Sequence, residues 1–150
     1  MNFRKIFYFI IVFAFIFGLI FFASKKNTQT NGIQYVKIAG QIIKVDLALT
    51  PESQVQGLSG RASLKEDEGM LFVFGKPDQY SFWMKDMNFP IDIIWLSQDL
   101  KVVYVEKDAK PESYPNSFSP AKKAQYVLEV TSGFAEKNNL KEGDSVQFLP

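Results

Sequence analysis

Alternating hydrophobic and polar residues dominate the chain from residue 33 onward. Residues 41–49 read Q-I-I-K-V-D-L-A-L, in which Ile43, Val45 and Leu47 alternate with Lys, Asp and Ala. This period of two is typical of a strand with one buried face. The stretch I-Q-Y-V-K-I-A precedes it, and Gly40 separates the two runs. We therefore expect a β-hairpin at the start of this region.

Six further hydrophobic runs have the length of strands: M-L-F-V-F, Y-S-F-W-M, I-D-I-I-W-L, K-V-V-Y-V-E, Y-V-L-E-V and V-Q-F-L. Turn sequences such as G-K-P-D, S-Q-D and K-E-G-D separate them. Thr50 and Pro51 can start a short helix that Gly57 would end, and residues 132–138 favour a second one that ends at Asn139. The pattern predicts a mainly β fold, a compact barrel-like or rolled antiparallel sheet of about eight short strands with two short helices.

One long segment, residues 107–124, has no strand pattern and contains three prolines. Segments of this length in a compact domain are usually binding loops, lids or disordered stretches. Tyr114 and Phe118 could anchor it on a surface, which leaves three interpretations open: a structural arm over a sheet edge, a binding lid, or disorder. The Tyr114–Pro115 bond is a candidate for the cis form, which costs little before proline.

An uncharged apolar run of 18 residues, residues 6–23, lies near the start of the chain. A helix of this length extends roughly 27 Å, close to the thickness of about 30 Å of the hydrocarbon core of a bilayer. A cleavable signal peptide usually has a shorter apolar region. Ala23 suits the last position before a cut, but Phe21 is large where cleavage favours a small residue. We expect an uncleaved transmembrane anchor, with a cleaved signal segment as the alternative.

The apolar run divides the chain into four parts. Residues 1–5 are expected to form a cytoplasmic stub, residues 6–23 the anchor, residues 24–32 a polar linker, and residues 33–150 a β-rich soluble domain. Two basic residues of the stub face two lysines beyond the anchor, and with the α-amine they give a weak bias toward a cytoplasmic N-terminus. The predicted location is the cell membrane, single-pass, with the soluble domain outside the cytoplasm, or secreted if the segment is cleaved.

Composition removes several classes of function. The 150 residues include no His and no Cys, so a Ser-His-Asp or Cys-His nucleophile and a metal site built on imidazole or thiolate are excluded. Residues 33–150 carry 13 Lys and Arg against 16 Asp and Glu, a net charge of −3 without a basic stripe. We therefore expect no cofactor and no nucleic acid. The expected partners are the membrane, through residues 6–23, and an unknown small ligand or envelope partner.

The densest cluster is F-W-M-K-D-M-N-F-P-I-D-I-I-W-L, residues 82–96, which holds both Trp and two of the four Met. Alternation along it predicts two strands joined by a turn at Asn88 to Pro90, a core hairpin with aromatic cross-strand packing. Because an unpaired charge in an apolar run costs several kcal/mol on full burial, the charged residues in and beside these runs are notable. They either pair with one another or contact a ligand in an aromatic-walled pocket.

Six residues are the candidates for ligand binding: Arg61, Trp83, Lys85, Asp86, Asp92 and Glu129. Arg61 is the one arginine among residues 33–150. Because its planar fork can bind a carboxylate through two hydrogen bonds, we expect it to be partly buried and joined to Asp92, or otherwise to Glu129. A structural Lys85–Glu129 pair is a further possibility.

Several motifs carry a family resemblance: G-L-S-G-R, E-G-M-L-F-V-F, F-W-M-K-D-M-N-F-P-I-D, V-L-E-V-T-S-G and E-G-D-S-V. In this order and spacing they resemble the prokaryotic family known as "domain of unknown function 192", over residues 34–149. The resemblance implies a small β-rich domain, often behind a secretion or anchor segment, without an established activity. Two departures are visible, Ser59 where the family has Met, and Asp86 and Met87 where it has Asn-Thr.

These features favour a membrane-anchored extracytoplasmic binding or accessory module with an aromatic-walled pocket. The alternative is a small carboxylate-dependent hydrolase that uses Asp86, Asp92 or Glu129, because Asp86 and Asp92 could converge across a turn as paired acids do in glycosidases. A remote alternative is soft-metal binding by the thioethers of Met84 and Met87. Whether the chain is an enzyme stays open at this point.

The predicted division of the chain can be tested by deletion. A fragment that starts at Ile33 should be soluble and folded, because the remaining sequence has normal strand alternation and turn chemistry. Size-exclusion chromatography and circular dichroism measure this. Aggregation of the fragment would contradict a self-contained domain.

Overall fold

The computed structural model describes residues 32–150, which form two sheets, two short α-helices and one 3-10 helix. The strands are β1 (Tyr35–Ile38), β2 (Gln41–Ala48), β3 (Glu68–Asp78), β4 (Phe82–Trp83), β5 (Ile91–Leu96), β6 (Val102–Ala109), β7 (Ser117–Phe118), β8 (Ala124–Thr131) and β9 (Val146–Leu149). The helices are α2 (Pro51–Gln56), the 3-10 helix η2 (Pro111–Ser113) and α3 (Phe134–Lys137).

The predicted anchor, residues 6–23, lies outside the described residues. Within residues 32–150, no helix combines the length and the apolar character that crossing a membrane requires.

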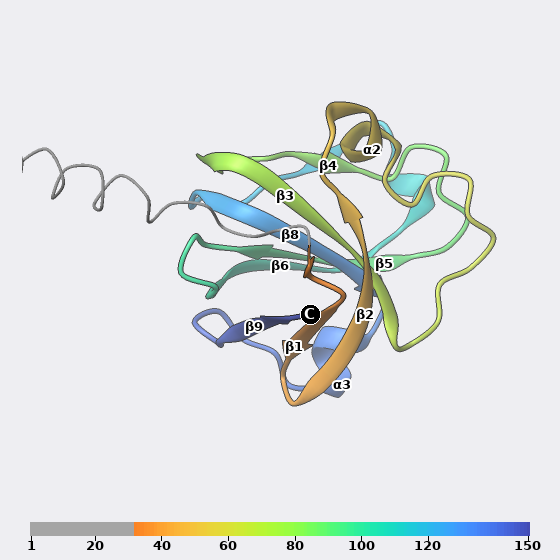
Figure 1. Ribbon diagram of the computed structural model, residues 1–150. Helices are drawn as coiled ribbons and strands as arrows, with labels where there is room; N and C mark the ends of the chain where they lie inside the picture. The colour runs from red at the N-terminus through yellow and green to blue at the C-terminus, as the bar shows by residue number, and fades with distance from the viewer. Residues whose placement is uncertain (1–31) are drawn as a thin grey trace, which may run out of the picture. The chain divides into compact units, whose positions relative to one another are not determined.

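The main sheet has seven strands in the order β6-β5-β8-β3-β2-β1-β9, and it curls into a half-barrel (Figure 1). Its two edge strands approach each other at one end, where an isolated bridge joins Lys101 to Ser145. The prediction of a mainly β, rolled sheet with two short helices is therefore confirmed in outline. It was wrong in one respect, since β2 and β3 run parallel. The crossover through α2 returns the chain to the same end of the sheet, and this connection makes the pair parallel.

The predicted opening hairpin is present as β1 and β2. Ala39 and Gly40 connect the strands, with φ angles of 48° and 77°. Two successive residues at positive φ are typical of the tight hairpin turn whose twist matches that of the flanking strands. The alternation of residues 41–49 therefore led to the right element.

Local capping chemistry explains helix α2. Thr50 and Ser53 form a capping box, in which each side chain accepts a hydrogen bond from the other residue's backbone N–H. Pro51 occupies the first turn, and Gly57 ends the helix at a φ of 50°. The second predicted helix, residues 132–138, is shorter in the structure because α3 begins only at Phe134.

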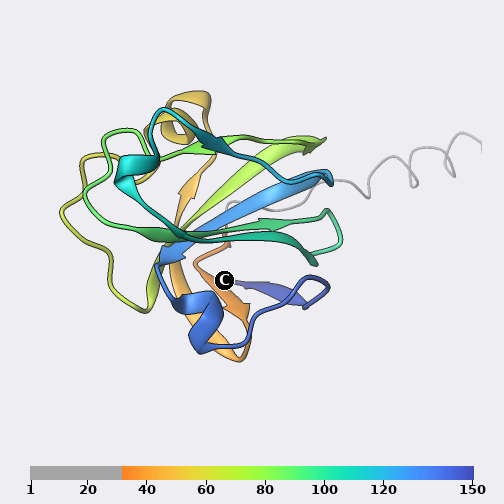
Figure 2. The ribbon, with the colours of Figure 1, turned by 180° about the vertical axis from the view of Figure 1, so that it is seen from behind.

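The predicted core hairpin within residues 82–96 is wrong. Strand β4 pairs with β7, whereas β5 pairs with β6 on one edge and β8 on the other. Both edges of β5 are therefore occupied, and β4 has to find another partner. That partner lies in the long segment 107–124, here called the arm, which carries η2 and β7 and whose Tyr114–Pro115 bond is cis. Its two ends were wrongly expected to have no strand, since β6 extends to Ala109 and β8 begins at Ala124. Figure 2 shows the arm on the same side of the molecule as α2.

Two hydrophobic clusters bury the main sheet on both faces. The inner cluster fills the curl of the half-barrel and includes Val36, Ile43, Leu71, Ile94, Leu128, Val130 and Phe134. The outer cluster lies on the opposite face under α2, β4 and the arm, and includes Leu58, Met70, Phe72, Met84, Ile93, Trp95 and Val127. This double burial explains why all six residues of β5 are buried.

Asp92 is a fully buried carboxylate in β5 and connects three elements of the inner face. Its Oδ1 accepts hydrogen bonds from the backbone N–H groups of Asp108 at 2.9 Å and Gly133 at 3.3 Å. Its Oδ2 accepts one from the N–H of Ala135 at 2.8 Å. These bonds attach the end of β6 and the start of α3 to the centre of the sheet, so Asp92 has a structural role.

An amide at this position tests that role. Asp92→Asn should lower the free energy of unfolding by about 1 to 3 kcal/mol, because the new NH₂ group faces a backbone donor and leaves it without an acceptor. The matched control is Asp86→Asn at an exposed turn position with a φ of 54°, which Asn tolerates. Urea denaturation of both variants measures the difference. Equal stability of the two variants would contradict the role assigned to Asp92.

Candidate functional site

A hollow on the outer face of the sheet, beside α2, brings together residues that lie far apart in the sequence. We call it the Trp83 hollow; its volume is about 290 Å³. Its lining residues are Pro51, Gln54, Val55, Gln56, Gly57, Leu58, Ser59, Phe72, Phe74, Tyr80, Ser81, Phe82, Trp83, Met87 and Glu129. A second hollow of about 300 Å³ shares Val55, Gln56, Ser59 and Trp83 with it and adds Gly60, Lys85 and Asp86. The two therefore adjoin each other at Trp83.

Interlocked aromatic rings form one wall of the Trp83 hollow. Phe82 meets Phe72 edge to face with ring centroids 4.8 Å apart, and it meets the buried Trp95 in the same way at 5.7 Å. Phe74 stacks on Tyr80 at 3.5 Å. Edge-to-face and stacked contacts hold rings in defined orientations, so this wall is a preformed apolar surface.

The rim of the hollow is unusually apolar for a surface. Trp83 is 50% exposed and meets Tyr114 of the arm edge to face, with ring centroids 6.2 Å apart. Tyr114 itself is 45% exposed, and Val55 on α2 is 71% exposed. Exposed large apolar residues that gather beside a cavity are characteristic of binding sites.

The polar side chains of the lining are largely used to hold the loops. Gln54 donates from Nε2 to the carbonyl of Val73, and Ser59 donates from Oγ to the carbonyl of Lys85. Tyr80 donates its hydroxyl to the carbonyl of Lys76. Because these donors are already bound to backbone, they keep the walls in place and are not free to contact a ligand.

Glu129 differs from these polar lining residues because it is buried. It lies on β8, opposite Met70 of β3 and Ile93 of β5, and its side chain is 5% exposed. Its Oε2 is buried and has no hydrogen-bond partner among residues 32–150. A buried polar atom without a partner costs free energy, on the order of 1 to 3 kcal/mol, so such atoms are rare in folded proteins.

Burial also changes the protonation of this carboxyl group. The low-dielectric surroundings raise the pKa of Glu129 to about 8, although the positive charge of Arg61 acts in the opposite direction. At neutral pH the free protein therefore holds a mostly protonated carboxyl at the base of the Trp83 hollow. Strongly shifted carboxyl groups in a cleft are typical of functional sites, although they also occur in structural networks.

The six candidates predicted from the sequence divide into separate groups. Trp83 and Glu129 line the Trp83 hollow, and Lys85 and Asp86 line its neighbour beside Trp83. Asp92 lies on the other face of the sheet, because it pairs with Val130 whereas Glu129 pairs with Ile93.

Arg61 does not have the expected partner. Its Nη2 lies 2.8 Å from Oδ2 of Asp46 on β2, in a partly exposed ion pair, so the prediction of Asp92 or Glu129 is wrong. Asp92 is on the opposite face and already satisfied by backbone N–H groups. Within residues 32–150, no ion pair joins Lys85 to Glu129 either, because the ion pairs found there all involve other residues.

Sequence reasoning missed the contribution of α2 and the arm to the site. Val55 was an available signal, since it is a large apolar residue on the exposed side of a two-turn helix, with polar neighbours on both sides. The arm residue Tyr114 was identified as an anchor but not as a partner of Trp83. Neither contact follows from local pattern, because each joins segments that are far apart in the chain.

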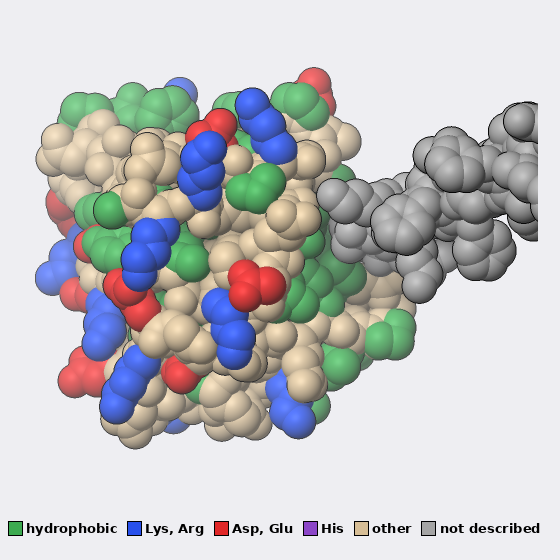
Figure 3. Space-filling model, turned by 90° about the vertical axis from the view of Figure 1, so that its left-hand side faces the viewer, with side chains coloured by type: hydrophobic (Ala, Val, Ile, Leu, Met, Phe, Trp, Pro, Cys, Tyr) green, Lys and Arg blue, Asp and Glu red, His purple; other side chains and the backbone are tan. Residues whose placement is uncertain are grey.

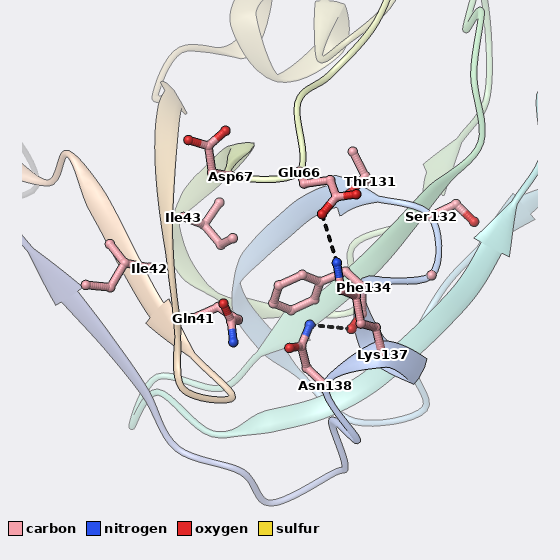
Figure 4. Close-up of a pocket in the computed structure, with 11 residues that line it drawn as sticks. Gln41, Ile42, Ile43, Glu66, Asp67, Thr131, Ser132, Phe134, Lys137 and Asn138 are labelled. Atoms are coloured by element: carbon pink, nitrogen blue, oxygen red, sulfur yellow. Dashed lines mark hydrogen bonds and ion pairs between the residues drawn. The ribbon is translucent and has the colours of Figure 1, made fainter.

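A different hollow, with a larger volume of about 640 Å³, lies near the start of β2 and α3 (Figure 4). Several of its polar side chains are paired: Lys137 binds Glu66 at 2.8 Å, and Asn138 donates to the carbonyl of Phe134. Charged side chains of both signs are interspersed on the face that Figure 3 shows. Because none of its described lining residues has a buried polar atom without a partner, this hollow is the weaker candidate.

The geometry gives little support to metal binding or to a carboxylate-dependent hydrolase. Within residues 32–150, no group of three Asp or Glu side chains is arranged to hold a metal ion. Met84 is buried in the outer cluster and does not line the Trp83 hollow, whereas Met87 packs against the same cluster and does line the hollow. Among the described residues that line the Trp83 hollow, Glu129 is the one acid, and this does not provide the pair of carboxylates that a hydrolase of the expected kind needs.

Comparisons with known proteins agree with the sequence resemblance. The family model DUF192, described as "Uncharacterized ACR", matches residues 34–148. A protein of unknown function from Novosphingobium aromaticivorans DSM 12444 has a similar crystal structure, with 30% identity and a TM-score of 0.73 over 81% of this chain and 89% of that one. A candidate transcription regulator from Sinorhizobium meliloti 1021 is 27% identical, with a TM-score of 0.71 over 76% of this chain and 90% of its own. No curated protein matches.

The raised pKa of Glu129 predicts how stability depends on pH. The carboxyl titrates near 4.5 when unfolded and near 8 when folded, so the folded state holds the proton more tightly between these values. Stability from this group is fully present below about pH 4.5 and is lost as the pH rises through about 8, by a few kcal/mol in total.

Glu129→Gln should remove this dependence, because the amide stays neutral at every pH. In thermal melts from pH 5 to pH 9, the melting temperature of the variant should rise relative to that of the wild-type protein as the pH rises. Glu136→Gln on the exposed side of α3 is the matched control and should follow the wild type. Parallel curves for wild type and Glu129→Gln would show that Glu129 is ionised in the folded protein.

Proposed function

The chain belongs to the DUF192 family, and from this premise we propose that it is a binding module whose ligand site is the Trp83 hollow. The observation that carries the proposal is the Oε2 atom of Glu129, which is buried at the hollow and has no hydrogen-bond partner in the part of the chain that the structure describes. A folded protein gains nothing from such an atom unless something else binds it.

The surrounding geometry supports the proposal. The aromatic wall is interlocked, and the loops around it are tied to backbone carbonyls, so the hollow exists before any ligand arrives. A preformed site loses less conformational entropy on binding than one that has to be assembled. The exposed rings of Trp83 and Tyr114 at the rim provide apolar area for the part of a ligand that stays outside.

We further propose that this module is held at the outer surface of the cell membrane by residues 6–23. The support is the apolar length of that segment and the basic residues that precede it. A polar linker, residues 24–32, would let the domain reach about 30 Å from the bilayer if it were extended. The module would then sample ligands close to the membrane surface.

The candidate transcription regulator among the similar structures does not alter the proposal. Residues 33–150 have a net charge of −3, and DNA binding depends on neutralising phosphates with clustered Lys and Arg. The hollow itself has no Lys or Arg among its described lining residues.

A ligand screen by thermal shift tests the proposed site. A ligand that binds only the folded state should raise the melting temperature of the wild-type chain. Trp83→Ala should weaken that ligand by about tenfold or more while the protein stays folded, because the indole is half exposed and its loss removes rim contact. Ile42→Ala removes an exposed apolar side chain from the other hollow and should leave binding unchanged. Equal binding by the wild type and Trp83→Ala would place the site elsewhere.

A further inference from the structure

The chemistry of the Trp83 hollow indicates which class of ligand it takes. Its described lining includes five aromatic residues, namely Phe72, Phe74, Tyr80, Phe82 and Trp83. The face of an aromatic ring carries negative electrostatic potential and attracts cations, most strongly at Trp. Among the described lining residues, Glu129 is the one acid and there is no Lys or Arg. Once Glu129 is ionised, its charge attracts cations, as the faces of the aromatic rings do.

The buried polar atom that is left without a partner in the described lining has the same preference for a cation. The donors of Gln54, Ser59 and Tyr80 are bound to backbone carbonyls. Among the described residues of the lining, Oε2 of Glu129 is the polar atom that is buried without a hydrogen-bond partner, and as a carboxylate it can only accept. A positively charged ligand group would pair with this carboxylate electrostatically, whereas an anion would not.

The charges around Glu129 on the neighbouring elements are compatible with this preference. On β3 and β5 the residues opposite it are Met70 and Ile93, which are uncharged. Arg61 follows α2 and is the cation whose field reaches Glu129, but its guanidinium is paired with Asp46 at 2.8 Å. Tyr80 is the other titratable group of the lining, and burial raises its pKa, so its hydroxyl stays neutral near pH 7. The charged rim residues Lys85 and Asp86 have opposite signs.

We propose that the Trp83 hollow binds a small organic ammonium ion, with the cationic nitrogen against Glu129 and the aromatic wall around its alkyl groups. This inference rests on the proposed function and names its ligand class. Binding converts the neutral, protonated carboxyl of Glu129 to the carboxylate and releases its proton to the solvent, so the negative charge that forms is balanced by the positive charge of the ammonium ion. The buried carboxylate is then paired, which an isolated buried charge requires.

The proton release makes the inference measurable. Because the cation pairs with the ionised carboxyl, its affinity should rise about tenfold per pH unit below the pKa of about 8 and level off above it. About one proton should be released per ligand bound near pH 6. A neutral ligand held by the protonated carboxyl would show the opposite dependence, with binding that weakens above pH 8.

Isothermal titration of the full chain in a non-ionic detergent, with choline as the probe, tests these expectations. Its neutral carbon isostere, in which carbon replaces the nitrogen, should bind at least about tenfold more weakly, because it has the same shape without the charge. Titrations in buffers of different ionisation enthalpy count the protons released. Glycerophosphocholine distinguishes two sources of the same group: binding as tight as that of choline indicates a lipid headgroup, and weaker binding indicates a free amine.

Three variants separate the contributions. Glu129→Gln should weaken choline by about tenfold or more and remove the pH dependence, while Glu136→Gln should match the wild type. Trp83→Ala, at a half-exposed position, should also weaken choline, and it decides the question if Glu129→Gln fails to fold.

The outcomes that overturn the inference differ from those that overturn the proposed function. Equal binding of choline and its isostere, absence of proton release, or binding that weakens above pH 8 would each exclude the cation. If choline fails but an uncharged ligand from the screen loses affinity in Trp83→Ala, the hollow is a binding site for a different class. If every ligand that stabilises the protein ignores Trp83→Ala, both proposals fall.

Discussion

Strand β8 is the constraint on which the rest of the domain depends. It is hydrogen-bonded to β3 along one edge and to β5 along the other, and the residues from Tyr126 to Val130 are all buried. A strand in this position cannot bend or slip by one residue without moving its apolar side chains to the wrong face. Gly69 on β3 reflects how closely the strands pack, since a Cβ there would lie 2.7 Å from the carbonyl oxygen of Glu129.

This constraint explains why Glu129 remains buried. Its backbone is held by two ladders, so the side chain cannot reach solvent through a shift of the main chain. The carboxyl lies under the end of α2, where a Cβ added to Gly57 would be 3.9 Å from Oε2. The free energy lost through its burial has to be offset by the apolar packing of the outer cluster. Burial of Glu129 therefore costs stability, and the ligand contact proposed above would offset part of that cost.

Asp92 and Glu129 illustrate how the two faces of one sheet assign different roles to the same chemical group. Asp92 faces the inner cluster, where three backbone N–H groups converge on it. Glu129 faces the outer cluster, where the nearby side chains of Gln54 and Ser59 donate to backbone carbonyls. Among the described residues, its Oε2 atom therefore has no hydrogen-bond partner. The difference arises from their neighbours across the sheet, because in a strand the side of each residue is fixed by register and not by its type.

The sequence by itself determined the elements with strong local signals. The hairpin turn at Gly40, the capping box at Thr50 and the alternation of the strands all depend on residues within a few positions of one another, so local chemistry decides them. The aromatic-walled pocket and its six candidate residues, which include Trp83 and Glu129, stay predictions.

Only the tertiary structure decided which of those elements and residues meet. The sequence could not show that β4 would pair with β7, that Arg61 would bind Asp46, or that α2 would close the hollow. Each of these contacts joins segments separated by many residues. The local sequence does not distinguish the observed partner from other strands or carboxylates that could have taken its place. The choice between them depends on which edges and faces the folded sheet leaves free, and this property belongs to the whole domain and to no single stretch of it.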